Sequence, residues 1–123
     1  MNTDGPGTDT YTDGTLKAEG HYIGGKRNGE WTYYFRNGQK KAVGKLIDDQ
    51  FNGPWIWWRE NGEKLQEGSF KLGVQVGWWR RYHANGALMD EGEWTAGKRT
   101  GEWTHYNPDG SVNRSKMYRA AQG

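Results

Sequence analysis

The sequence predicts an all-β protein, an elongated single antiparallel β-meander built of tandem β-hairpins. A 24-residue repeat is the first observation behind this prediction, because the same short aromatic segment returns four times along 123 residues. The second is an Asn-Gly or Asp-Gly pair at the end of each copy. The third is composition: 20 Gly argue against long helices, since each interior Gly costs about 1 kcal/mol relative to Ala in a helix.

Five positions recur at the interval of 24 residues. They are a Trp, a Gly two residues before it, a turn pair, a second Gly six residues after the turn, and an aromatic or Leu position. These columns are Trp31, Trp55, Trp79 and Trp103; Gly29, Gly53, Gly77 and Gly101; Asp13-Gly14, Asn37-Gly38, Asn61-Gly62, Asn85-Gly86 and Asp109-Gly110; Gly20, Gly44, Gly68 and Gly92; and Tyr22, Leu46, Phe70, Trp94 and Tyr118. Chance does not produce five registers at one spacing.

Each turn pair predicts a β-hairpin with a type I′ turn, in which both central residues need φ > 0. The segment 30–36 is the expected incoming strand, 39–47 the outgoing strand and 24–29 the return loop. Two strands per repeat, about 4.8 Å apart, predict a rod of roughly 40 Å for four copies.

The whole chain, residues 1–123, is expected to form one repeat domain. Residues 14–109 hold four 24-residue repeats. Residues 1–13 are a degenerate N-terminal cap with Gly7 in the Trp column, and residues 110–123 are a C-terminal cap strand with Lys116 in a Gly column. Degenerate end repeats are typical of solenoid proteins.

Aromatic rings are expected to supply the core, because eight Trp, seven Tyr and three Phe accompany few aliphatic residues. We expect the four recurring Trp rings to cover the backbone gaps left by Gly20, Gly44, Gly68 and Gly92, and to stack as a ladder. A second column, Tyr34, Trp58, Tyr82 and Tyr106, lies three residues after each Trp. Either both faces of the sheet carry aromatics, or a bulge returns the two columns to one face.

Composition disfavours several function classes. A formal net charge of +2, from 17 basic and 15 acidic side chains, is too balanced for a nucleic-acid-binding surface. The absence of Cys excludes disulfides and thiolate chemistry. No apolar stretch approaches the ~20 residues that span a bilayer. A cytoplasmic location is the default expectation, and a periplasmic or lipoprotein-anchored one applies if a signal segment has been removed.

Catalytic residues, metal ligands and cofactors are not expected. His21, His83 and His105 occupy three different repeat columns, without metal-ligand spacing. Glu19, Glu67 and Glu91 form a carboxylate column with Lys nearby, as expected of a solvated sheet face rather than of a pair of catalytic acids.

Partner binding is predicted for positions that change in type between repeats while staying aromatic or cationic, because Trp, Tyr and Arg dominate binding hot spots. Two columns, two and four residues after the recurring Trp, meet this description. Trp78 joins them because it lies beside the apolar loop 72–77. The predicted partner-binding residues are Tyr33, Phe35, Trp57, Arg59, Trp78, Arg81, His83 and His105.

The pattern G-x-W-x-x-Y-x-x-N-G-x-x-x-x-E-G-x-Y resembles the MORN-variant repeat, a relative of the membrane occupation and recognition nexus motif. The resemblance covers nearly the whole chain, and residues 29–44 and 77–94 are the best copies. The sequence departs from the pattern at two places. Val43 stands where the pattern has Glu, and Asp-Asp-Gln at 48–50 stands where it has Asn-Gly-Lys. The resemblance implies a non-catalytic binding protein, such as an antitoxin-like or immunity-like component of a bacterial toxin system.

Two function classes are in contention. A protein partner, such as a toxin or effector, is favoured by the resemblance and by the heterogeneous aromatic columns. A glycan- or choline-binding module is the alternative, because aromatic hairpin repeats also hold cell-wall polymers and cation–π attraction recognises quaternary ammonium. Membrane-lipid binding ranks third, since no polybasic cluster accompanies the aromatics. The exposed sheet edges leave a homodimer open.

Overall fold

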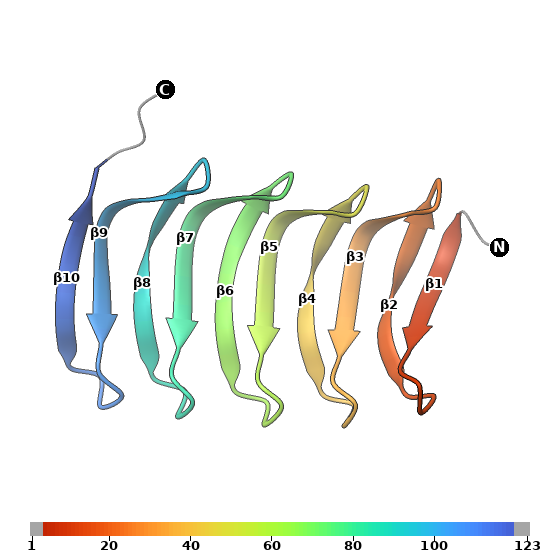
Figure 1. Cartoon of the computed structure of the whole chain (residues 1–123), viewed down its shortest axis with the longest axis horizontal. Coiled ribbons are helices and arrows are strands. Elements are labelled where there is room, and N and C mark those ends of the chain that lie inside the picture. The colour runs from red at the N-terminus through yellow and green to blue at the C-terminus, as the bar shows by residue number, and fades with distance from the viewer. Residues whose placement is uncertain (1–3, 120–123) are drawn as a thin grey trace.

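The computed structural model describes residues 4–119 and confirms the all-β prediction. Ten antiparallel strands form one open sheet in sequence order (Figure 1). The strands are β1 (Gly5–Thr10), β2 (Leu16–Ile23), β3 (Lys26–Tyr34), β4 (Lys40–Ile47), β5 (Gln50–Trp58), β6 (Lys64–Lys71), β7 (Val74–Tyr82), β8 (Leu88–Thr95), β9 (Lys98–Tyr106) and β10 (Val112–Tyr118). Within this part of the chain, no helix is long and apolar enough to cross a bilayer.

The Asn-Gly turns differ from the predicted type I′ geometry. In the turn between β3 and β4, the Gly38 N–H donates to the Phe35 carbonyl at 3.0 Å and the Phe35 N–H to the Gln39 carbonyl at 2.8 Å. Gly38 has φ 86°, whereas Asn37 is absent from the residues with positive φ. This is a type I turn followed by a left-handed Gly, which forms a three-residue loop with a bulge. The Asn37 side chain instead accepts the Gln39 N–H at 2.9 Å.

The type I′ turns lie at the opposite end of the hairpins, where a return loop was expected. Both central residues have positive φ in these four turns, and only two residues separate the strands. The turn pairs are Gly24-Gly25, Asp48-Asp49, Leu72-Gly73 and Ala96-Gly97. The predicted return loop 24–29 was therefore too long, since β3 already begins at Lys26.

Replacing Leu72 by Asn should stabilise the protein by about 1 kcal/mol, because Asn tolerates the left-handed region better than Leu does. Leu72 has φ 45° and a 48% exposed side chain, so little packing is lost. Thermal or urea unfolding measures the change. Leu72→Ala is the matched control: it removes the same side chain but keeps an unfavourable residue at this φ, and an equal gain in that variant would contradict the explanation.

The recurring Trp rings cover the glycines, as predicted. Trp31, Trp55, Trp79 and Trp103 are at most 4% exposed. A Cβ built on the glycine across the strand pair would overlap the indole in every case. The four pairs are Gly20 with Trp31, Gly44 with Trp55, Gly68 with Trp79 and Gly92 with Trp103. We call this side of the sheet the tryptophan face.

A bend in the odd-numbered strands brings each indole over its glycine. β3, β5, β7 and β9 turn sharply near their starts (Figure 1). The bend contains a left-handed Gly, such as Gly53 with φ 79°, and a shift in strand register between Gly44 and Lys45. The Trp55 Nε1–H donates to the Lys45 carbonyl at 2.9 Å, next to this shift. The same indole-to-carbonyl bond recurs in the other three repeats.

The predicted ladder of the four recurring indoles was right only in part, because these indoles do not stack on one another directly. Recurring Trp residues lie two strands apart, about 10 Å, which exceeds the 4.5–7 Å of ring contacts. Intervening side chains fill the gaps: Tyr33 lies 6.3 Å from Trp31 and 6.2 Å from Trp55 between ring centroids. Trp57 lies 5.8 Å from Trp55 and 5.9 Å from Trp79 in the same way. In the next repeat the position equivalent to Tyr33 and Trp57 is occupied by Arg81, so the series of stacked rings ends there.

Aromatics occupy both faces of the sheet, which decides between the two alternatives left open above. The Tyr34 hydroxyl donates to Glu19 at 2.6 Å. Glu19 is the neighbour of Ala18, whose side chain is buried among the rings of the tryptophan face. Because successive strand residues point to opposite sides, Glu19 and Tyr34 lie on the other side. We call that side the tyrosine face, after Tyr34, Tyr82 and Tyr106.

Candidate binding surface

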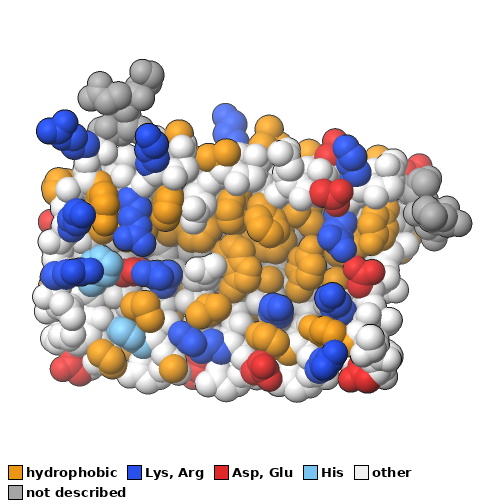
Figure 2. Space-filling model, viewed as in Figure 1, with side chains coloured by type: hydrophobic (Ala, Val, Ile, Leu, Met, Phe, Trp, Pro, Cys, Tyr) orange, Lys and Arg blue, Asp and Glu red, His pale blue; other side chains and the backbone are white. Residues whose placement is uncertain are grey.

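Seven of the eight predicted partner-binding residues lie on the tryptophan face, and Trp78 lies on the tyrosine face. Tyr33, Trp57, Arg81 and His105 alternate with the buried Trp residues along β3, β5, β7 and β9. Figure 2 shows the tryptophan face, with hydrophobic side chains gathered over its middle and N-terminal strands. Lys, Arg and His side chains gather over its C-terminal strands. The face therefore has two chemically different halves.

The apolar half contains a shallow hollow of about 240 Å³. Its lining comes from β2, β3, β4, β5 and the turn after β1, and it is mainly aromatic. The lining residues are Tyr11, Lys17, Tyr33, Lys41, Ala42, Phe51 and Trp57, together with Tyr34, whose hydroxyl is bonded to Glu19 on the tyrosine face. Ala42 is buried and forms the floor, so the hollow exists because the neighbouring rings project beyond a small side chain.

The aromatic rings present their edges, because neighbours cover their faces. The ring plane of Trp57 makes angles of 27° with Trp55 and 28° with Trp79. Tyr33 is flanked similarly by Trp31 and Trp55, at 34° and 37°. The edge of an aromatic ring is its positive part and the face its negative part. Tyr33 and Trp57 thus suit apolar side chains and hydrogen-bond acceptors better than cations.

The C-terminal half is built around an ion pair between a buried carboxylate and an exposed guanidinium. Asp90 is 0% exposed, and Arg81 Nε donates to it at 3.0 Å, with a second hydrogen bond from Arg81 Nη2. His105 Nδ1 lies 3.5 Å from the same carboxylate. The hydrogen bonds with Asp90 raise the pKa of the Arg81 guanidinium. Two of the predicted residues, Arg81 and His105, are thereby held in place by one carboxylate.

The column of Phe35, Arg59 and His83 links one repeat to the next. Arg59 Nη2 donates to the Tyr82 carbonyl at 2.9 Å, and His83 Nε2 lies 2.8 Å from the Tyr106 carbonyl. Tyr11, in the same column, donates to the Tyr34 carbonyl at 2.7 Å. Phe35 has no polar atom for this bond, and Lys41 Nζ lies 5.7 Å from its ring centroid. Arg59 and His83 therefore have a structural role beside any role in binding.

Four residues of the C-terminal half were not predicted from the sequence: Gln66, Gln75, Asp90 and Arg99. Asp90 and Gln66 stand in the column of Ala18 and Ala42, and this change from Ala to polar residues was the available signal. Gln75 and Arg99 were missed because their column was taken for a return loop. Arg99 lies over the Trp103 ring, 4.4 Å from its centroid.

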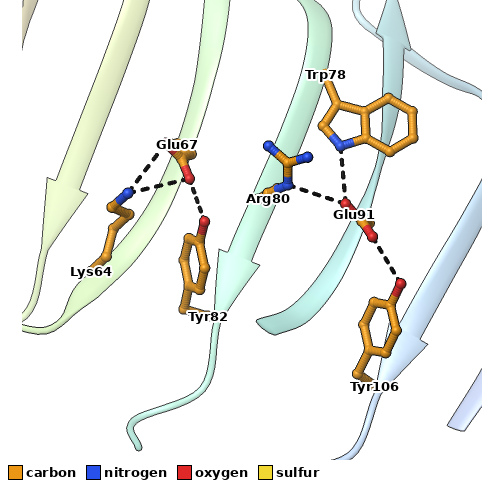
Figure 3. A network of polar contacts seen from close by, with 7 residues as sticks. All are labelled: Lys64, Glu67, Trp78, Arg80, Tyr82, Glu91 and Tyr106. Atoms are coloured by element: carbon orange, nitrogen blue, oxygen red, sulfur yellow. Dashed lines mark hydrogen bonds and ion pairs between the residues drawn. The ribbon is translucent and has the colours of Figure 1, made fainter. Parts of the chain in front are cut away.

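The tyrosine face carries phenol–carboxylate pairs between neighbouring strands (Figure 3). The Tyr106 hydroxyl donates to Glu91 at 2.8 Å, and the Tyr82 hydroxyl donates to Glu67. Trp78 Nε1 and Arg80 Nε each donate to the other oxygen of Glu91 at 3.1 Å. Burial raises the pKa of Glu91, but these hydrogen bonds outweigh it and lower the pKa overall. The 48% exposed Trp78 is thus tethered to this network.

Val43, which replaces the Glu of the repeat pattern, is accompanied by a second change, at Trp58. Three repeats pair a Glu with a Tyr hydroxyl on this face: Glu19 with Tyr34, Glu67 with Tyr82 and Glu91 with Tyr106. In the remaining repeat the equivalent positions are Val43 and Trp58, which are both apolar. Both members have changed together, so no carboxylate is left without its phenol.

Alkaline pH should destabilise the protein through these phenols. Burial first, and then the hydrogen bond to Glu67, raise the pKa of Tyr82 to about 12. Between pH ~10, where an unfolded Tyr loses its proton, and pH ~12, the folded protein binds more protons, so stability falls as pH rises. Unfolding in urea across this range should show the decline, and Tyr82→Phe should make it shallower. An unchanged slope in that variant would contradict the assignment.

A family model described as the MORN repeat variant matches residues 27–45, 51–72 and 99–120, together about half of the chain. The chain belongs to the MORN repeat variant family. The match leaves out residues 73–98, although β7 and β8 keep the register of the other repeats. This MORN repeat is the one that carries Trp78, Arg81 and Asp90. A search of curated proteins found no match.

MORN repeats are non-enzymatic modules that often bind membranes or proteins. The architecture of this chain is compatible with a non-catalytic scaffold, since its repeats present side chains on two faces of one sheet. The repeat motif alone does not specify which partner is bound, because the function of a repeat scaffold lies in its surface residues.

Proposed function

We propose that this MORN repeat protein is a non-catalytic scaffold that binds a protein partner along its tryptophan face. The observation that carries the proposal is the row of half-buried rings, Tyr33 and Trp57, which alternates with the buried indoles beside an apolar hollow. Protein interfaces are enriched in such aromatic side chains near their centres.

Covered ring faces favour a protein over a glycan or choline. A quaternary ammonium group binds over the face of an aromatic ring, within about 6 Å of its centroid. The faces of Tyr33 and Trp57 are already occupied by neighbouring indoles. Ring edges and a hollow floored by Ala42 suit the apolar side chains of a polypeptide instead.

A toxin or other effector is one candidate for the partner, on the resemblance of such repeat proteins to antitoxin and immunity components. Under this proposal the chain would act by covering the effector's surface, without any chemical step. Location in the cytoplasm is the default that accompanies this role.

The test compares two adjacent tryptophans on opposite faces of β5. Peptides are selected from a random display library on the immobilised chain, and their affinities are measured by calorimetry. Trp57→Leu should weaken binding by about thirtyfold, the loss of a binding hot spot. The matched control, Trp58→Leu on the tyrosine face, should leave affinity unchanged.

Two results would overturn the proposal. One is a set of selected peptides whose affinity is the same for Trp57→Leu and the wild type. The other is thermal stabilisation by choline or cell-wall oligosaccharides that disappears in Trp57→Leu, because it would place a small cation or sugar on the same surface. Circular dichroism of both variants checks that the sheet is intact.

A further inference from the structure

We propose that the partner segment is an extended polypeptide that is apolar at one end and acidic at the other, lying across the strands from β3 to β10. This inference rests on the proposed function and gives the chemistry of its ligand. It follows from three hollows that lie one after another along the tryptophan face. Their lining changes from mainly aromatic in the first to mainly cationic in the last.

The last hollow is cationic. It measures about 290 Å³ and lies over β9 and β10. Its lining residues are Arg99, His105, Arg114, Ser115, Lys116 and Tyr118. Within residues 4–119, no carboxylate lies within ion-pair distance of Arg99, Arg114 or Lys116. Asp90, the acid beside this hollow, is already bound by Arg81.

Arg99 is oriented before any ligand arrives. Its guanidinium carbon lies 4.4 Å from the Trp103 ring centroid, 5.8 Å from that of Trp94 and 6.0 Å from that of Tyr118. The corresponding residue in the first repeat, Arg27, also lies over an indole, 5.1 Å from the Trp31 ring centroid, but it is already paired with Asp9 at 2.9 Å. Arg99 is therefore a cation held by aromatic rings, and a planar guanidinium of this kind binds carboxylates well.

The middle hollow offers groups for a peptide backbone. It measures about 190 Å³ and joins the apolar and cationic halves. Two amide side chains, Gln66 and Gln75, line it together with Arg81 and Arg99 over the rings of Trp79, Trp94 and Trp103. An amide side chain both donates and accepts hydrogen bonds, as the N–H and C=O groups of an extended chain require.

The strand spacing sets the length of the segment. From β5, which carries Trp57, to the junction of β9 and β10 is between four and five strand spacings. At about 4.8 Å per strand this distance is roughly 20 Å, which about six extended residues span. We therefore expect apolar and acidic groups about six residues apart.

Synthetic peptides test the order of these chemistries. The probe is a fluorescein-labelled peptide with Leu and Phe at one end, a spacer of about six Ser and Thr residues, and a run of Glu at the other end. One control peptide carries Lys in place of Glu, and a second has a spacer half as long. Fluorescence anisotropy at low and physiological salt gives the affinities.

Charge reversal on β10 provides the matched variants, since Arg114 and Lys116 are exposed. Arg114→Glu with Lys116→Glu should weaken binding of the Glu peptide by about tenfold or more and transfer the preference to the Lys peptide. Lys45→Glu, an exposed charge reversal on the tyrosine face, should change neither affinity. Binding of the Glu peptide should also weaken as salt rises.

Equal affinity for the Glu and Lys peptides, or for the long and short spacers, would overturn the inference. The proposed function would survive that result if library peptides still lost affinity in Trp57→Leu, and would fail if they did not. Sedimentation of the chain with phosphatidylserine vesicles, abolished by the β10 charge reversal while no peptide binds, would also overturn the inference in favour of a membrane surface.

Discussion

Trp55→Ala is expected to lower the free energy of unfolding by about 3–5 kcal/mol, the usual cost of removing a fully buried large aromatic side chain. Trp55 is 1% exposed, contacts the rings of Tyr33, Phe51 and Trp57, and donates a hydrogen bond to Lys45. The substitution also opens the backbone of Gly44 to water. A chain of this length has roughly 5–15 kcal/mol of stability, so the variant should be largely unfolded at modest urea concentrations.

Urea titration followed by tryptophan fluorescence and far-ultraviolet circular dichroism measures this loss. Trp58→Ala is the matched control because it removes the same side chain from the adjacent, partly exposed position of β5. We expect the control to cost less than half as much. Equal losses would mean that the buried position over Gly44 has no special weight.

Gly44→Ala is expected to cost about 3 kcal/mol, at the upper end of what one added methyl group costs in a packed site. A Cβ on Gly44 would overlap the Trp55 indole, which cannot move without losing its contacts with neighbouring rings. The backbone of Gly44 does not have positive φ, so the cost comes from the overlap alone. This cost is unusual because Ala is normally preferred to Gly within a strand by about 0.5–1 kcal/mol.

Gly53→Ala separates overlap from backbone strain. Gly53 has φ 79° and no atom within 4 Å of an added Cβ, so its loss should be limited to the 1–2 kcal/mol of a left-handed backbone. Chemical unfolding of both variants under the same conditions gives the comparison. A smaller loss for Gly44→Ala than for Gly53→Ala would contradict the packing explanation.

The repeat pattern was sufficient to predict the sheet, its antiparallel order and the contact of each indole with a glycine. A strict period of 24 residues places equivalent side chains at equivalent positions, so one deduced contact holds for all four copies. The turn types were harder. Asn37-Gly38 is compatible with a type I′ turn and with a type I turn followed by a left-handed Gly, and hydrogen bonds across the loop distinguish the two.

The candidate surface was predicted only in part. Two-residue alternation assigns Tyr33 and Trp57 to the face of the buried indoles, and Trp78 to the other, once the strands are known. The partnership of Arg81 with Asp90 could have been deduced, because a hairpin turn centred on Asn85-Gly86 places the two residues opposite each other, but Asp90 was not singled out. The cations of the last hollow were missed for other reasons. Arg99 was assigned to a return loop, and Arg114 and Lys116 lie in the C-terminal cap strand, outside the four repeats that were compared.

A double-mutant cycle on Gly44 and Trp55 tests most directly the claim that indoles packed over glycines hold the sheet together. The measurement is the cost of Gly44→Ala in a Trp55→Leu background, where the smaller side chain leaves room for the added methyl group. We predict that the cost of about 3 kcal/mol disappears there, which gives a coupling energy of similar size. Additive losses, with a coupling below about 0.5 kcal/mol, would contradict the account.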